Sequence, residues 1–342
     1  MFMDIFNQDA FSLASMLQAV ERVDTKPDRL GSLGIFTPNP IRTAIVSVEE
    51  RAGTLALIKT SARGAPLDQR KTEKRNMRNF ETKRIAKGDR ILASELQFVR
   101  QFGTEDQLAE LQVELARRLD GPSGLVAEVE MTMENMRLGA VQGILADADG
   151  SPIYNWFTEF GITQATEVDF DLDNSSPASG VLRKTVQDKV VRAMRRKAKG
   201  ARYSGIRALC GSAFFDDLIA HPEVRETYLN QQGASELREG YDGISFTFGG
   251  VTWEEYVGTD DNSTVAIDTD KVKFFPEGTG NTVFEMALSP GEQFSHLGQL
   301  GQPYYPMVVP DMKRDQYVDL EVYSYPLFLC KRPEMLLRGK RT

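Results

Sequence analysis

The segment "AIVSVEERAGTLALIKTSARGAPLDQRKTEKRNMRNF" (44–80) joins a β-hairpin pattern to a polar, basic arm. Apolar and β-branched residues flank the turn "EERAG", which predicts strands at Ala44–Val48 and Thr54–Ile58. The stretch Lys59–Asp89 contains almost no large apolar residue, so we expect it to be irregular. A lone two-stranded hairpin is only marginally stable in water. We therefore expect the hairpin and its arm to become ordered on the surface of another chain.

The charge of the chain is unevenly divided. Arg63–Arg90 has ten basic and four acidic residues, a net charge of +6, while the whole chain carries −8, which leaves −14 for the rest. A basic arm on an acidic body can bind nucleic acid or a second copy of that body. Proteins that bind single-stranded nucleic acid interleave basic residues with aromatic residues that stack on the bases, and the only aromatic residue of this arm is Phe80. The acidic isoelectric point also favours a protein partner of complementary charge.

Length and composition indicate an ordinary globular protein. At 342 residues, with 41% hydrophobic and 26% charged residues, the chain can form one large or two modest domains. No apolar run approaches membrane-spanning length, and the N-terminal residues are not those of a signal peptide, so no membrane association is expected. Cys210 and Cys330 lie far apart without a surrounding motif, which is typical of reduced thiols.

Helical periodicity is clearest in the middle of the chain. An apolar stripe at intervals of three and four residues predicts a helix over Leu125–Leu145. The stripe consists of Val126, Val129, Met133, Met136, Ala140 and Ile144. A shorter helix is predicted from Thr104 to Leu119, and most of the sequence after Gly243 has a β pattern. Helices and strands are segregated more than alternated, which indicates the α+β class.

A catalytic site is difficult to build from this sequence. His296 has no acidic or cysteine partner at metal-ligand spacing, and His221 stands before a proline at a helix end, where capping is the more common role. Cys210, eleven residues before His221, could pair with it as nucleophile and base. Cys210 also completes the apolar strand "GIRALC", where a small buried thiol is the more frequent case. The sequence therefore predicts no enzyme, no cofactor and no metal site.

Seven segments, in order along nearly the whole chain, resemble one known family. They are "RLGSLGIFTPNPIRT" (29–43), "VEERAGTLALIKTSARGAP" (48–66), "MTMENMRLGAVQGILADADGSPIYNWFTEFGITQ" (131–164), "ALCGSAFFDDLIAHPEVRETY" (208–228), "FGGVTWEEYVG" (248–258), "FFPEGTGNTVFEMALSPGE" (274–292) and "SYPLFLCKRPEML" (324–336). None of them carries a mechanism alone, but their order and coverage make the match specific. On these residues the sequence resembles the major capsid protein E family of lambda-like tailed bacteriophages.

The resemblance implies the tailed-phage major capsid fold, divided into five segments. These would be an N-terminal arm (1–40), an extended loop or E-loop (41–92), a peripheral (P) domain with a long spine helix (93–175), an axial (A) domain (176–312) and the C-terminal strands of the peripheral domain (313–342). The E-loop of such a protein crosses a neighbouring subunit. The hairpin would then be the root of an arm that the next subunit stabilises.

The expected subunit interface is the E-loop with its basic arm. The residues expected there are Glu49, Glu50, Arg51, Arg63, Arg70, Lys71, Lys74, Arg75, Arg78, Lys83 and Arg84. The stripe of the spine helix is expected to be core.

The resemblance also implies a structural role without catalysis. The chain would assemble as hexamers and pentamers into an icosahedral head in the host bacterial cytoplasm, and the shell would become part of the virion. Double-stranded DNA would be packaged inside, bound non-specifically. A portal and a separate scaffolding protein are expected partners. The scaffolding protein is expected to be separate because about 40 residues before the E-loop are too few for a fused scaffold. Whether a decoration protein also binds is left open. The alternative is an encapsulin-like nanocompartment shell, which shares the fold and packages cargo protein.

Overall fold

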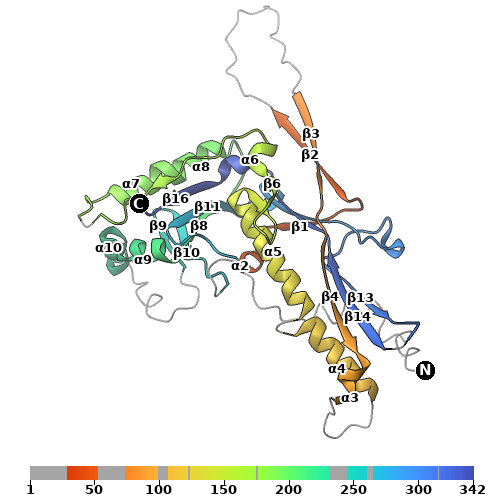
Figure 1. The fold of residues 1–342 in the computed structure, drawn as a ribbon. Coiled ribbons are helices and arrows are strands. Elements are labelled where there is room, and N and C mark those ends of the chain that lie inside the picture. The colour runs from red at the N-terminus through yellow and green to blue at the C-terminus, as the bar shows by residue number, and fades with distance from the viewer. Residues whose placement is uncertain are drawn as a thin grey trace, which may run out of the picture.

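The computed structural model describes residues 29–52, 74–98, 107–121, 124–174, 176–230, 245–259, 265–314 and 316–342. Two parts, each built on β-sheet, lie on either side of a long helix, and a two-stranded ribbon projects from them (Figure 1). Within these residues no helix has the length and apolar character needed to span a bilayer.

One part of the fold is built on a mixed six-stranded sheet. In spatial order its strands are β7 (Val168–Asp169), β16 (Leu337–Lys340), β11 (Lys271–Glu277), β8 (Gly205–Cys210), β10 (Val251–Glu255) and β9 (Ser245–Phe248). On one side lie α7 (Val181–Thr185), the π-helical segment Val186–Val191 and α8 (Arg192–Lys197), and on the other lie α9 (Ser212–Ala220) and α10 (Pro222–Asn230) (Figure 1). The central strands β8 and β11 are covered on both faces, because the successive residues Ala208 and Leu209 in β8 and Phe274 and Phe275 in β11 are all fully buried.

The other part contains two three-stranded sheets. Their strands are, in order, β1 (Thr37–Pro40), β12 (Phe284–Leu288) and β15 (Pro326–Cys330), and β13 (Tyr305–Pro310), β14 (Tyr317–Ser324) and β4 (Ile85–Leu92). The 18-residue helix α5 (Leu125–Gln142) packs against β4, β14 and β15. It is met by α2 (Arg29–Ser32) and α4 (Gln107–Asp120), and α3 (Ala93–Phe98) follows β4 directly.

Short elements connect these parts. After α5 come the hairpin strands β5 (Ile144–Ala146) and β6 (Pro152–Asn155) and the single turn α6 (Trp156–Glu159). The Asn155 side chain caps α6 by accepting hydrogen bonds from the backbone N–H groups of Phe157 and Thr158. Within the described residues, 3₁₀ turns lie at Gly280–Thr282, Phe294–His296 and Pro333–Met335.

The apolar stripe of α5 faces the core over most of its predicted length. The five buried members are Val126, Val129, Met133, Met136 and Ala140. The helix ends at Gln142, however, because Gly143 takes the left-handed conformation with φ of 85° and its N–H bonds back to Ala140 O. The expectation that Ile144 completes the helical stripe was therefore wrong: Ile144 begins β5 and is only half-buried.

The strand pairing of the hairpin also differs from the prediction. The first strand extends over Ile45–Ala52, and its partner is Lys74–Glu81, not Thr54–Ile58, which lies outside the described residues. The expectation that Lys59–Asp89 is irregular was wrong for its second half, which contains this partner strand and most of β4. Long-range contacts decide both strands, because β4 pairs with β14 over all of its eight residues and the partner strand packs an aromatic ring against a distant helix.

Strand pairing also crosses the predicted domain boundaries. β16, in the C-terminal segment, pairs with β11 and β7 in the six-stranded sheet. β12 and β13, which precede residue 312, pair with strands of the other two sheets. The chain therefore passes between the two parts of the fold more often than a five-segment division describes.

Candidate assembly interface

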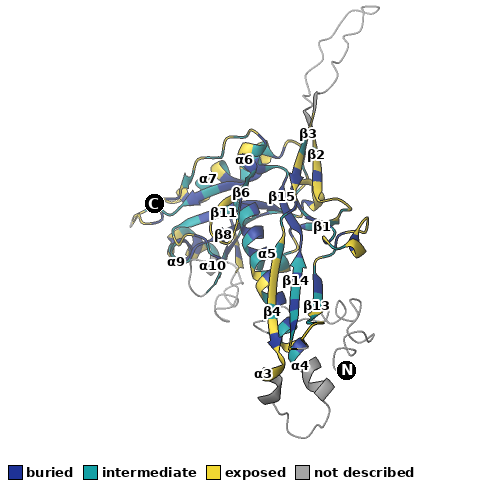
Figure 2. Cartoon of the chain, turned by 45° about the vertical axis from the view of Figure 1, so that its right-hand side comes forward, coloured by how far each residue is buried: buried dark blue, intermediate teal, exposed yellow. Residues whose placement is uncertain are grey.

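The ribbon that projects from the fold consists of β2 (Ile45–Ala52) and β3 (Lys74–Glu81). Its strands are antiparallel, and their register runs from Ile45 opposite Glu81 to Ala52 opposite Lys74. Among its described side chains, the buried pair is Val46 and Phe80, which lie opposite each other at the root. Figure 2 shows burial at this root and exposure farther along the ribbon.

An aromatic cluster fixes the root of the ribbon. The Phe80 ring lies edge-on to Tyr154 and Trp156, with ring centroids 5.6 Å and 5.2 Å away. The guanidinium of Arg78, on the same face of β3, lies 5.3 Å from the centroid of the Phe160 ring. Tyr154, Trp156 and Phe160 all belong to the β6–α6 region, so this region sets the direction in which the ribbon leaves the subunit.

One face of the ribbon leaves apolar side chains exposed. Ile45 at the root and Met77 farther out, on the face opposite to Val46 and Phe80, are both exposed. The register of the backbone places Arg51 directly opposite Arg75.

The predicted interface residues are spread over the ribbon and the segment after it. Glu49, Glu50 and Arg51 lie on β2, Lys74, Arg75 and Arg78 lie on β3, and Lys83 and Arg84 follow β3. Arg63, Arg70 and Lys71 lie outside the described residues.

Several cations at the end of the basic arm have partners in their own chain. Lys83 Nζ lies 3.5 Å from Glu81, and Arg84 Nε lies 3.4 Å from Glu292. Arg90 forms a two-pronged pair with Asp319, at 2.6 Å and 3.0 Å. Each pair is partly solvated and contributes little to stability. These intrachain pairs nevertheless reduce the charge that the end of the arm offers to a neighbour.

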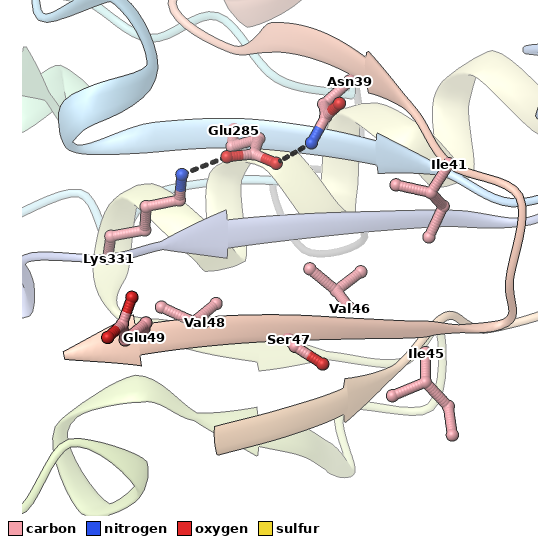
Figure 3. A pocket seen from close by; sticks show the side chains of 9 residues that line it. All are labelled: Asn39, Ile41, Ile45, Val46, Ser47, Val48, Glu49, Glu285 and Lys331. Atoms are coloured by element: carbon pink, nitrogen blue, oxygen red, sulfur yellow. Dashed lines mark hydrogen bonds and ion pairs between the residues drawn. The ribbon is translucent and has the colours of Figure 1, made fainter. Parts of the chain in front are cut away.

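A groove follows β2 at the root of the ribbon, between β2 and β15 (Figure 3). Its lining consists of Asn39, Ile41, Ile45, Val46, Ser47, Val48, Glu49, Glu285 and Lys331. In its wall, the buried carboxylate of Glu285 is held by an ion pair with Lys331 and by a 2.5 Å hydrogen bond from Asn39 Nδ2. Sequence reasoning identified only Glu49 of this set, because strand pairing brings the other polar residues together from distant segments.

The short helix α2 anchors the N-terminal segment to both parts of the fold. Arg29 and Arg207 both form ion pairs with Glu254, whose side chain is 1% exposed. The hydrogen bond to Glu254 raises the pKa of Arg29. The backbone N–H of Leu30 donates to Glu134 Oε1 on α5 at 2.9 Å. The buried carboxylate of Glu254 is thus compensated by two cations, Arg207 and Arg29. Arg29 is the first residue that the structure describes.

A second charged joint connects α4 to β4 and α3. The Arg118 guanidinium donates to Asp89 at 3.2 Å, to Glu95 at 2.5 Å and to Glu114 at 2.7 Å. Hydrogen bonds from Arg117 and Arg118 lower the pKa of Glu114 to about 2. The ion pairs of Arg118 therefore hold α4 against the end of β4 and the start of α3, where the segment 41–92 ends.

Cys210 and His221 do not form a catalytic pair. The Cys210 thiol is fully buried at the end of β8, and burial raises its pKa. The His221 Nδ1 accepts a hydrogen bond from the backbone N–H of Glu223 at 3.3 Å, and burial lowers the pKa of the imidazole. A protonated thiol without access to solvent is not a competent nucleophile. In the part of the chain that the structure describes, no group of three or more His, Cys, Asp or Glu residues could hold a metal ion.

The fold is similar to that of solved phage capsids. The capsid of cyanophage P-SCSP1u gives a TM-score of 0.52 at 9% sequence identity, with 90% of this chain and 86% of that chain covered. The mature capsid of bacteriophage PhiM1 gives a TM-score of 0.50 at 12% identity, with 90% and 85% covered. The chain therefore has the tailed-phage capsid fold, which is a mixed α+β fold.

Sequence comparison identifies the family. The family described as phage major capsid protein E matches residues 12–341. The major capsid protein of Salmonella phage Felix O1 is 26% identical over 366 aligned residues, which cover 96% of this chain and 95% of that protein. The major capsid protein of Pseudomonas phage KPP10 is 25% identical and covers 90% of each.

These findings define a structural protein of the bacteriophage head. The chain belongs to the phage major capsid protein E family. It is a component of the head shell and of the virion, and the family is structural, not enzymatic. The predictions of a capsid role and of the absence of catalysis are thereby confirmed.

Proposed function

We propose that the chain assembles as hexamers and pentamers into an icosahedral head around double-stranded DNA, and that the β2–β3 ribbon is the E-loop that crosses a neighbouring subunit. The observation that carries this proposal is the ribbon itself. Its apolar packing is concentrated at Val46 and Phe80, while Ile45 and Met77 are left exposed. An isolated two-stranded ribbon is marginal in water, so contact with a second copy supplies what its own subunit does not.

The charge of the ribbon supports the same arrangement. Arg51 and Arg75 are opposed in register, and the segment 63–90 has a net charge of +6 on a chain of −8. An acidic surface of a neighbour is complementary to such a ribbon. Glu49, Glu50, Arg51, Lys74 and Arg75, with Arg63, Arg70 and Lys71 beyond them, are the residues that we assign to this contact.

The arrangement of the sheets supports a division of the chain into two domains. We assign the axial domain to the six-stranded sheet and its helices, essentially residues 176–277 with β7 and β16 added. The peripheral domain then comprises α5, the two three-stranded sheets and the segment 278–336. Relative to the predicted boundary at residue 312, this moves β12 and β13 to the peripheral domain.

Other components of the head are proposed from the family. A portal and a separate scaffolding protein would act in assembly, and the DNA inside would be bound without sequence preference. The intrachain partners of Arg84 and Arg90 leave fewer cations for phosphate contact at that end of the arm.

Shortening the ribbon tests the proposal. Ala52 and Lys74 are opposed in register, so an Asn-Gly turn can replace residues 53–73 and leave the Phe80 root intact. The expected result is a folded chain, with an unchanged thermal transition, that no longer forms closed particles in negative-stain images. The matched controls are single Arg70→Ala and Lys71→Ala variants, which should still assemble because a single surface ion pair contributes at most about 1 kcal/mol.

The opposite outcome would refute the proposed role of the ribbon. If the shortened chain formed shells at the concentration that the unmodified chain requires, the ribbon would not be needed between subunits. A larger deletion of residues 60–85 is less informative, because it removes β3 and Phe80 and so disrupts the subunit itself.

A further inference from the structure

The loop Gly291–Gln302, between β12 and β13, exposes large apolar side chains and buries a polar one. Phe294 is 94% exposed, Leu297 70% and Leu300 51%, whereas His296 is buried among them. Single exposed apolar residues are common on protein surfaces. Three within seven residues, on a loop whose histidine points inward, form a concentrated apolar surface. We name Gly291–Gln302 the apolar loop.

The apolar loop is held in this conformation by its own contacts. The His296 ring lies edge-on to Tyr305, with ring centroids 4.7 Å apart. The Tyr305 hydroxyl accepts a hydrogen bond from the Gln302 N–H at 2.8 Å and donates one to Ser289 O at 3.2 Å. The Gln299 N–H bonds back to His296 O at 3.1 Å. These contacts hold the loop in place, so the exposure of Phe294 follows from the loop conformation.

The apolar loop is also fastened to the base of the ribbon. The Gly301 N–H donates to Ile41 O at 2.9 Å, just before β2, and Glu292 pairs with Arg84, just after β3. In Figures 1 and 2 the loop projects from the body near β1, beside this base. The loop thus lies beside the root of the ribbon whose outer part the proposed function assigns to contacts between subunits.

We propose that the apolar loop is a preformed contact surface for a second copy of this chain, with Phe294 as its anchor. The inference rests on the proposed assembly of the chain into a shell. The loop contains no lysine or arginine, and its one acidic residue, Glu292, is paired with Arg84. Such a surface offers nothing to DNA phosphates and fits an apolar protein surface. An exposed aromatic ring on a rigid support is the kind of residue that dominates interface energetics.

Two substitutions at one position test the inference. Phe294→Asp should raise the protein concentration at which shells appear by at least tenfold, because a carboxylate would be desolvated at the contact. Phe294→Leu, the matched control, keeps an apolar side chain and should assemble nearly as the unmodified chain does. Neither variant should shift the thermal transition of the unassembled subunit, because the Phe294 side chain is 94% exposed there.

Cross-linking identifies the occupant independently of these variants. A photoreactive phenylalanine analogue at position 294, activated in assembled particles, should join two copies of the chain. The same analogue at Val257 is the control. Val257 is an apolar residue distant from this loop in the sequence, and its side chain is 72% exposed. Cross-links confined to one chain, or formed only with a different head protein, would overturn the inference.

The outcomes separate this inference from the proposed function. If Phe294→Asp and the unmodified chain form shells at the same concentration, the inference falls while assembly stands. If the unmodified chain forms no shells with its scaffolding protein present, the proposed function falls, and the inference falls with it.

Discussion

The Phe80 ring lies edge-on against the indole of Trp156, with ring centroids 5.2 Å apart and an interplanar angle of 85°. Phe80 belongs to β3 of the ribbon, and Trp156 begins α6, just after the β5–β6 hairpin. Trp156 is itself fully buried. This aromatic contact therefore connects the ribbon to the core, and it is the point at which a change in the core would alter the position of the ribbon.

Phe80→Ala should lower the free energy of unfolding by about 3–5 kcal/mol, because it removes a buried ring and leaves a cavity beside Trp156. Met77→Ala is the matched control. Met77 lies on the same strand with its side chain 70% exposed, so its truncation should change the stability of the subunit by about 0.5 kcal/mol or less. Denaturant titration of the unassembled subunit measures both. Equal losses for the two variants would contradict the assignment of Phe80 to the root.

The two arginines that form ion pairs with Glu254, Arg29 and Arg207, should contribute unequally to the stability of the chain. Arg207→Met removes a cation whose side chain is 13% exposed, and it should cost about 3–5 kcal/mol by leaving a buried carboxylate poorly compensated. Arg29→Met should cost less, because the Arg29 side chain is 40% exposed and Arg207 remains. Unfolding of Arg207→Met, Glu254→Leu and the double variant Arg207→Met/Glu254→Leu gives the coupling energy of this pair. A double variant whose loss of stability equals the sum of the losses of Arg207→Met and Glu254→Leu would show that the two residues do not interact.

The helix α5 could be predicted from the sequence, and the strand pairing of the ribbon could not. Val126, Val129 and Met133 recur at helical spacing because one face of α5 is buried, so the period reports the burial directly. The helix end was misplaced because Gly143, a common helix terminator, lies inside the apolar stripe. For β3, "KRNMRNFE" has no alternation strong enough to outweigh "TLALI", which stands closer to β2 in the sequence.

The candidate interface shows the same difference between local and long-range signals. Charge runs are visible in a sequence, so the basic arm could be predicted as an interface, and that assignment stays a prediction. The groove depends on Asn39, Glu285 and Lys331, which β1, β12 and β15 bring together, and no local pattern connects them. The apolar loop was missed because its sequence alternates polar and apolar residues irregularly, and only the structure shows that His296, not Phe294, points inward.

Acid should weaken the joint between α4 and β4. The pKa of Glu114 is about 2 in the folded chain, below its ordinary value of 4.5. A lowered pKa means that the unfolded chain binds the proton first, so this stabilisation is complete above about pH 4.5 and is lost as the pH falls toward 2. Glu114→Gln should therefore be less stable than the unmodified chain at pH 6, and the difference should shrink as the pH is lowered from 4.5. Urea titrations of both chains at several pH values measure it, and a difference that is constant with pH would contradict the prediction.

Gly143 is required both by its backbone conformation and by the ring beside it. Its φ is 85°, and a Cβ at this position would overlap the Phe157 ring. Gly150 has a φ of 81° and nothing within 4 Å of the corresponding position, so it carries the backbone requirement alone.

The two glycines form a matched pair. Gly150→Ala should cost about 1–2 kcal/mol, the penalty for a left-handed residue with a side chain. Gly143→Ala should cost more, by about 1–3 kcal/mol, because the added methyl group displaces the buried Phe157 ring. Truncating the ring in the double variant Gly143→Ala/Phe157→Leu should recover part of this excess. Thermal and denaturant unfolding of the unmodified chain, the two glycine variants and the double variant measures these costs. Equal costs for the two glycine variants would mean that α5 ends at Gly143 for its backbone conformation alone.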